Sequence, residues 1–163
     1  MTNTELKKYV AALPRPAQVA FAAIVIERTL QAAVPFVDSD VRILVREVLN
    51  ALWSYLAGSP LDAEFLESLH GRLDDKIEVS LGKNWEEGEE PNQPVLFAMC
   101  CSCTLPIAAL RWQDKPGDAM GAVLDHYFDV WNRYSDIDFM TYNRERFSGE
   151  VTWAEHIVKW LVR

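Results

Sequence analysis

The sequence contains no long uninterrupted apolar run and no signal-peptide pattern. Its richest apolar stretch, Val19 to Val34, is broken by Glu27 and Arg28, so no segment reaches the roughly 18 uncharged apolar residues typical of a transmembrane helix. The N-terminal stretch MTNTELKKYV lacks the apolar core and small-residue cleavage site of a secretory signal. We therefore expect a cytoplasmic protein that does not interact with a membrane.

Cysteine is scarce and confined to one place. Cys100, Cys101 and Cys103 are odd in number and too close together for a disulfide framework, so reduced thiols are expected. A redox or zinc site would need thiolates, which form near positive charge or a metal. The neighbouring residues 95–99 and Leu105 are apolar, and no second cysteine pair lies at zinc-ligand spacing. We interpret the cluster as small apolar side chains in a helix–helix contact and expect no cofactor.

Familiar catalytic motifs are also missing. The sequence has no G-x-S-x-G, P-loop, H-E-x-x-H or G-x-G-x-x-G, and we expect that the protein is not an enzyme. The nearest alternative is a metal or small-ligand site at Asp125, His126 and Asp129, because the two aspartates share one helix face and a carboxylate can tune a histidine for proton transfer.

Solvated helix faces explain these three residues more simply. Di-iron bundles carry a Glu-x-x-His motif on each of two helices, whereas this chain has one such match, Glu67-x-x-His70. A small-ligand or metal-binding bundle, with or without catalytic activity, therefore stays open as the alternative function.

Glycine and strand-like alternation are both scarce. The chain has 7 glycines among 163 residues, and alternation occurs only around residues 77–81 and 137–142. Elsewhere apolar residues recur every three or four positions, as on the buried face of a helix. The sequence predicts an all-α fold in which a single domain, residues 1–163, forms one compact bundle of six to seven helices.

Prolines, glycines and small polar residues indicate the helix ends. Asp38–Asp40 supplies cap candidates for the third helix, and Gly58 suits its left-handed end. Ser59-Pro60 is expected to cap and open the fourth helix, which Gly71 could split in two. Pro106 should kink the fifth helix, because proline removes a helical hydrogen bond. The expected helices begin near Thr4, Pro16, Asp40, Pro60, Pro94, Asp118 and Thr152.

The apolar pattern resembles that of known proteins. Its features are Phe21 followed by Glu27-Arg28, the helix Leu49-x-x-Leu52-Trp53-x-x-Leu56, and the apolar pair Pro94–Leu110 and Asp118–Trp131 joined by a short turn. They cover most of the chain and resemble a family of small, all-helical bacterial proteins of unknown function, and broadly the immunity proteins of bacterial toxin systems. The resemblance implies a compact helical fold and a bacterial source, and it transfers no catalytic residues.

Negative charge is concentrated in one segment. Between Asp62 and Glu90, ten acidic and three basic residues leave −7, whereas the rest of the chain carries 14 acidic and 13 basic residues. The net charge of −8 therefore comes almost entirely from this segment. Because binding phosphates requires a basic face, we expect a basic protein and not a nucleic acid as the partner.

The acidic segment ends in the loop GKNWEEGEEPNQP, residues 82–94. Tryptophan is a frequent interface anchor and carboxylates steer basic partners, although Trp85 could instead pack on its own core while the glutamates face water. The leading hypothesis is an immunity protein that covers the basic surface or active site of a cognate toxin, such as a nuclease or nucleotide-acting enzyme. The expected contact residues are Asp74, Asp75, Glu78, Trp85, Glu86, Glu87, Glu89 and Glu90.

Two further groups of side chains suggest structural roles. An arginine–carboxylate pair between Glu27-Arg28 and the set Arg42, Arg46 and Glu47 could join the second and third helices. Exposed tryptophans could form the interface of a homo-oligomer, a third hypothesis for which the candidates are Trp112, Trp131, Trp153 and Trp160.

Overall fold

The computed structural model describes residues 2–84, 93–111, 120–128, 153, 155–157 and 159–161. The all-α prediction is confirmed, because every regular element in these residues is helical. The elements are α1 (Asn3–Ala12), α2 (Arg15–Ala33), the 3-10 helix η1 (Val34–Phe36), α3 (Ser39–Leu56), α4 (Ala63–Asn84), α5 (Gln93–Met99), the π-helix η2 (Cys100–Thr104) and α6 (Leu105–Leu110). Residues 120–128 form a further helical segment.

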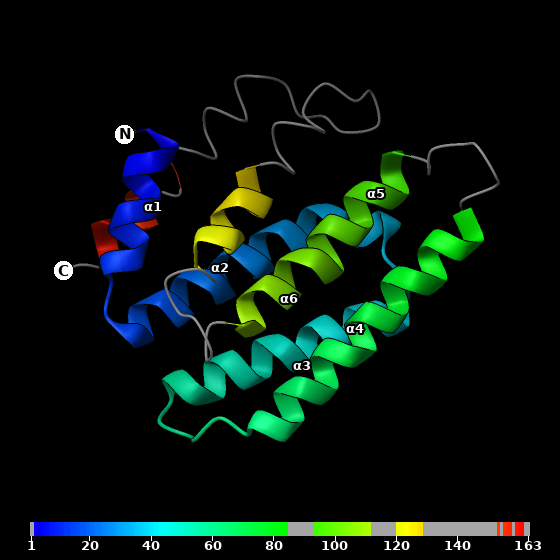
Figure 1. Ribbon diagram of the computed structural model, residues 1–163, viewed down its shortest axis with the longest axis horizontal. Coiled ribbons are helices and arrows are strands. Elements are labelled where there is room, and N and C mark those ends of the chain that lie inside the picture. The colour runs from blue at the N-terminus through cyan, green and yellow to red at the C-terminus, as the bar shows by residue number, and fades with distance from the viewer. Residues whose placement is uncertain are drawn as a thin grey trace.

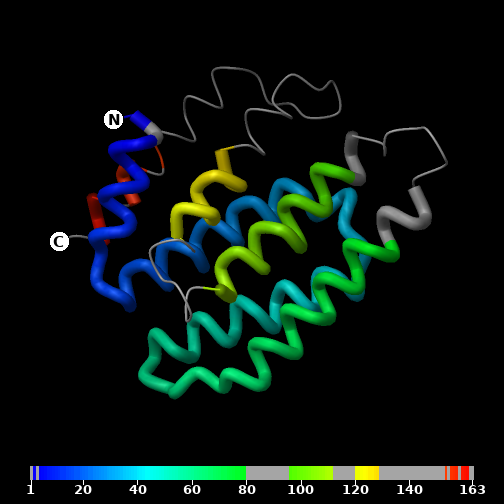
Figure 2. The backbone as a smooth tube through the Cα atoms, viewed as in Figure 1, coloured from blue at the N-terminus to red at the C-terminus, as the bar shows by residue number. Residues whose placement is uncertain are grey.

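The central helix of the bundle is α2. It packs against α3, α6 and η2, and its Phe21, Val25 and Ile26 side chains are fully buried. Figure 1 shows α3 and α4 side by side along one edge of the bundle, while α1 lies at one end with the described C-terminal residues. Figure 2 follows the same path as a tube and shows α4 on the outer side of α3.

The first helix begins at Asn3, one residue before the expected start at Thr4, and side chains stabilise both of its ends. The Thr2 hydroxyl accepts a hydrogen bond from the Glu5 backbone N–H at 3.2 Å, and the Glu5 carboxylate accepts one from the Thr2 backbone N–H at 2.7 Å. This reciprocal pair is a capping box. At the other end the buried Gln18 amide donates to the Ala11 and Leu13 carbonyl oxygens, which stabilises the turn into α2.

The start of α4 differs from the prediction. The helix begins at Ala63, and its cap is Asp62 rather than Ser59, because the Asp62 Oδ1 accepts hydrogen bonds from the Glu64 and Phe65 backbone N–H groups. Gly58 has the left-handed φ of 96° and follows the end of α3, as expected. Gly71 does not split α4, because buried leucines on either side (Leu69 and Leu73) hold the helix against the core.

Pro106 leads to a π-helical turn. Proline has no N–H group for the usual helical hydrogen bond, and the backbone before it widens into η2, where the Leu105 N–H donates to the Cys100 carbonyl oxygen five residues earlier. Figure 1 shows α5 and α6 following one direction through this turn. The sequence predicted a kink at Pro106, and the structure has a π-helical turn directly before it, which is an insertion into the helical ladder.

Within the described residues, one helical stretch, Arg15–Phe36, is long and apolar enough to cross a membrane by length and composition alone. Half of its apolar window is buried inside the described structure, where α2 packs against α3, α6 and η2. The core helix of a soluble protein and a signal sequence both pass the same test. The cytoplasmic location accordingly stays a prediction.

Candidate protein-binding surface

The outer face of α4 carries five exposed acidic side chains. Positions three, four and seven residues apart share one face of a helix, so these five side chains lie opposite the buried Leu66, Leu69 and Leu73. The face extends for about 21 Å along the helix axis. We call it the acidic face, and its residues are Glu64, Glu67, Asp74, Asp75 and Glu78.

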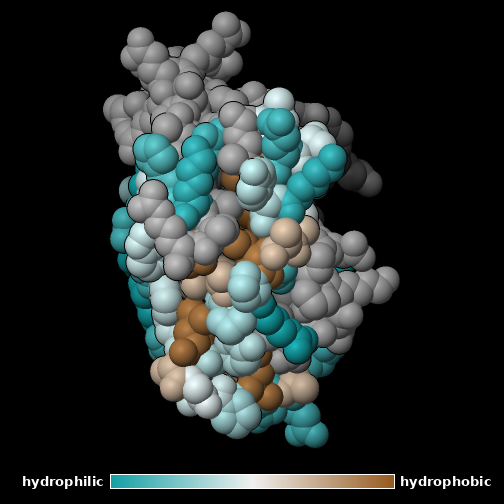
Figure 3. Space-filling view, turned by 90° about the vertical axis from the view of Figure 1, so that its left-hand side faces the viewer, coloured by the Kyte–Doolittle hydropathy of each residue, from teal (hydrophilic) through white to brown (hydrophobic). Residues whose placement is uncertain are grey.

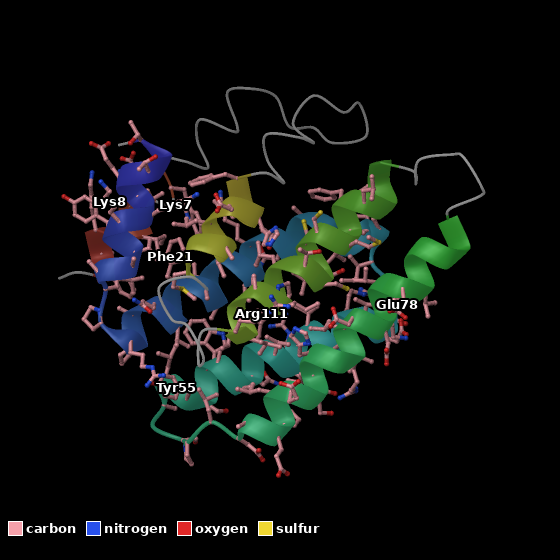
Figure 4. The ribbon with its side chains drawn as sticks, viewed as in Figure 1. Lys7, Lys8, Phe21, Tyr55, Glu78 and Arg111 are labelled. Atoms are coloured by element: carbon pink, nitrogen blue, oxygen red, sulfur yellow. The ribbon has the colours of Figure 1, made fainter. Side chains whose placement is uncertain are left out.

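Two basic side chains of α4, Arg72 and Lys76, are paired with acids of α3. Arg72 bonds to Glu47 of α3 at 2.8 Å, and Lys76 forms an ion pair with Asp40 of α3. Both bases therefore point toward α3 and neutralise acids of that helix. Figure 4 shows Glu78 at the outer side of α4.

Most of the acidic face has no basic partner in the part of the chain that the structure describes. Asp74 lies 3.2 Å from the His70 Nδ1 atom. No ion pair involves the other four carboxylates within these residues. The excess negative charge of the sequence is thus concentrated, in part, on the outer surface of α4.

The structure brings together three of the eight predicted contact residues. Asp74, Asp75 and Glu78 lie on the acidic face, whereas Trp85, Glu86, Glu87, Glu89 and Glu90 lie outside the described residues and stay predictions. Sequence reasoning counted Glu64 and Glu67 in the acidic segment but left them out of the site. Their spacing of three, seven and fourteen residues from the other acids is the signal that could have included them.

A groove between α3 and α4 borders the acidic face. It contains two hollows, with cavity volumes of about 320 and 390 Å³. The first, here called the Phe65 hollow, is lined by Pro60, Leu61 and Phe65 together with Glu47, Asn50 and Asp62. The second, here called the Val79 hollow, is lined by Leu44, Val79, Asp40, Arg72, Asp75 and Lys76. Sequence reasoning missed this groove because its walls come from two helices.

Phe65 and Val79 are exposed apolar side chains of α4. Phe65 is 42% exposed and Val79 is 49% exposed. Each is one of the residues that line its hollow. The groove therefore offers apolar contact area directly beside carboxylates.

The cysteine cluster is part of the core. Cys101 and Cys103 are buried in η2, and all three cysteines are free. Burial raises the pKa of the Cys101 thiol well above its usual value and also raises the pKa of the Cys103 thiol. Across the described residues, no group of three or more His, Cys, Asp or Glu side chains is placed to hold a metal.

The alternative site at Asp125, His126 and Asp129 is only partly described. Asp125 is exposed and forms an ion pair with Lys7 of α1. Figure 4 shows Lys7 on the side of α1 that faces residues 120–128. This pair gives Asp125 a role in holding α1 on the bundle. Asp129 lies outside the described residues, so the metal site stays a prediction.

An arginine–carboxylate pair does join α2 and α3, as predicted. Arg46 bonds to Glu27 at 2.9 Å. The neighbouring Arg28 lies over the Trp153 ring, 4.3 Å from its centroid, and Trp153 also packs against Tyr127. Trp153 is therefore partly engaged within its own chain.

Of the four tryptophans named as candidates for a homo-oligomer interface, one is both described by the structure and exposed. Trp160 is 65% exposed, while Trp112 and Trp131 lie outside the described residues. Figure 3 views the end of the molecule that carries α1, where hydrophobic atoms form a narrow, broken strip among hydrophilic side chains.

Comparisons with protein-family models, curated proteins and solved structures find no match to this chain.

Proposed function

We propose that this protein is a non-catalytic binding module whose acidic face on α4 binds a basic partner protein. The observation that carries the proposal is the segregation of charge on α4. Its carboxylates point to solvent, while Arg72 and Lys76 pair with acids of α3. A helix whose bases faced outward would have neutralised its own surface.

The acidic face is suited to electrostatic recognition. Its carboxylates project from one rigid helix, and neighbours on a helix face lie within the roughly 8 Å over which charges interact at physiological ionic strength. Their fields add, which raises the association rate of a basic partner and favours one orientation over others. A fixed helix also avoids the ordering cost that a flexible acidic tail would incur on binding.

In its most specific form, the proposal is an immunity protein that covers the basic substrate cleft of a cognate toxin. Such a neutraliser needs complementary shape and charge and no chemistry of its own. The acidic segment continues in sequence to Glu86, Glu87, Glu89 and Glu90, with Trp85 as the expected anchor. A gene for a toxin directly beside the gene for this chain would support this version.

The acidic face can be tested with four neutral substitutions and a labelled oligo-arginine peptide as the probe. The variant carries Glu64→Gln, Glu67→Gln, Asp74→Asn and Glu78→Gln. Since an exposed ion pair contributes about 0.2–1 kcal/mol, we expect the peptide affinity to fall about tenfold, and its dependence on salt to weaken. Fluorescence anisotropy measures both quantities.

A matched control separates the acidic face from overall charge. Four lysines at exposed positions away from α4 raise the net charge by the same amount, through Ala11→Lys, Ala12→Lys, Gln31→Lys and Ala57→Lys. The control should retain most of the affinity. Equal losses in both variants, or no loss in the α4 variant, would remove the acidic face from the proposal.

A further inference from the structure

Each hollow of the α3–α4 groove contains one carboxylate that has no basic partner among the described residues. Four acids and two bases line the groove, and both bases are already paired, Arg72 with Glu47 and Lys76 with Asp40. The remaining acids are Asp62 in the Phe65 hollow and Asp75 in the Val79 hollow. Within the described residues no ion pair involves either of them.

Each of these carboxylates shares its hollow with an exposed apolar side chain of α4. Phe65 lines the same hollow as Asp62, and Val79 the same hollow as Asp75. Asp62 uses Oδ1 to cap α4, which leaves its second oxygen for another donor. An arginine or lysine has matching chemistry, because its aliphatic stem can cover apolar surface while its charged head reaches a carboxylate. An arginine also stacks favourably on a phenyl ring such as that of Phe65.

The two hollows have a defined separation. Asp62 and Asp75 are thirteen residues apart, which corresponds to about 20 Å along the axis of α4. An extended peptide spans that distance with about six residues. The Arg72–Glu47 pair joins α3 and α4 between the hollows, since Arg72 lines one and Glu47 lines the other.

We propose that the α3–α4 groove binds two basic side chains, about six residues apart in an extended segment of the basic partner. One enters the Phe65 hollow and pairs with Asp62, and the other enters the Val79 hollow and pairs with Asp75. This inference rests on the proposed function and adds to it: the acidic face attracts the partner, and the groove determines the spacing that is recognised.

The test uses two synthetic peptides of identical composition. In one, two arginines are separated by a glycine–serine spacer so that they stand six positions apart, and in the other they are adjacent. Both are titrated into the full-length protein and followed by amide chemical shifts in NMR. We expect the spaced peptide to bind about threefold more tightly or better, the size of one exposed ion pair, and to shift the amide signals of Phe65 and Val79.

Single substitutions assign the preference to the groove. Asp62→Asn keeps a good helix cap, because asparagine caps about as well as aspartate, and Asp75→Asn changes an exposed position. Either should abolish the preference for the spaced peptide, and Phe65→Ala should reduce it. Glu78→Gln removes the same charge from the acidic face and should leave the preference intact.

The two proposals fail differently. Equal binding of both peptides to the unmodified protein, or a preference that survives Asp62→Asn and Asp75→Asn, would overturn the groove proposal and leave the acidic face untouched. If the variant with four substitutions on α4 bound oligo-arginine as tightly as the unmodified protein, the acidic-face proposal would be overturned, whatever the result with the spaced peptides.

Discussion

In η2, the surroundings of the cysteine thiols determine their pKa. Cys101 and Cys103 are buried among apolar side chains, and this burial raises the pKa of both thiols because a thiolate is poorly solvated there. Ser102, between them, directs its hydroxyl to the Ala98 carbonyl oxygen. These residues therefore pack in the core with their thiols protonated at neutral pH.

This burial predicts slow alkylation. In the folded protein at neutral pH, iodoacetamide should leave Cys101 and Cys103 largely unmodified, because each thiol is both shielded and protonated. Both should react once the chain is unfolded in guanidinium. Mass spectrometry of proteolytic fragments measures the extent at each position. Rapid modification of Cys101 in the folded protein would show that η2 opens readily.

The Asp40–Lys76 pair predicts a pH-dependent coupling between α3 and α4. The hydrogen bond from Lys76 lowers the pKa of the Asp40 carboxyl below its ordinary value. The pair therefore stabilises the fold above the pKa of an unfolded aspartate, and this stabilisation is lost as the pH falls through the lowered pKa of the folded state.

A double-mutant cycle measures this coupling. Urea unfolding of the unmodified protein, Asp40→Asn, Lys76→Met and the double variant should give a favourable coupling at neutral pH that disappears in acid. The pair of Lys76→Met with Glu64→Gln serves as the control and should show no coupling. A coupling that persisted in acid would contradict the ion pair.

At the scale of the helix, α4 contains a glycine in its exposed middle. A Cβ added at Gly71 would meet nothing within 4 Å, so Gly71→Ala should stabilise the protein by about 0.5–1 kcal/mol through helix propensity and a less flexible unfolded chain. Gly58→Ala is the matched contrast, because φ of 96° is unfavourable for a side chain, and it should destabilise. Chemical denaturation gives both values. Destabilisation by Gly71→Ala would mean that α4 is strained or broken in solution.

Helix ends show where local sequence was sufficient. Gly58 lies where the sequence predicts, because a left-handed glycine depends on neighbours in sequence. The capping box of Thr2 and Glu5 was not predicted, although it too depends only on neighbours in sequence. Ser59 was the wrong cap for α4, since Asp62 satisfies two backbone N–H groups at once. The shape of the turn before Pro106 could not be read locally, because a kink and a π-helical turn both accommodate the missing N–H.

At the scale of the whole molecule, residues of the same helix differ in how deeply the core buries them. Leu69 is completely buried, whereas Phe65, one turn earlier, is 42% exposed. Leu69→Ala should therefore cost about 2–5 kcal/mol of unfolding free energy, and Phe65→Ala less than about 1 kcal/mol. Urea denaturation of both variants checks the contrast. Similar costs would show that Phe65 belongs to the core.

The candidate site was predicted only in part. A charge count located the acidic segment, and helical periodicity placed Asp74, Asp75 and Glu78 on a solvent-facing surface. The groove, with its two hollows, required the positions of α3 and α4 relative to each other. Glu47 and Asp62 are fifteen residues apart in sequence yet line one hollow, and no periodicity within a single helix reports such a meeting.

The sequence by itself determined the helical class, most helix positions and the concentration of charge, because apolar spacing, caps and formal charge are properties of neighbours along the chain. The tertiary structure alone decided that Arg72 and Lys76 pair with α3 and leave the acids of α4 facing solvent. The physical reason is that a charge is neutralised by whatever lies beside it in space. Folding therefore turned an acidic segment with interspersed bases into a helix whose Arg72 and Lys76 pair with α3 and whose acidic face lies in solvent.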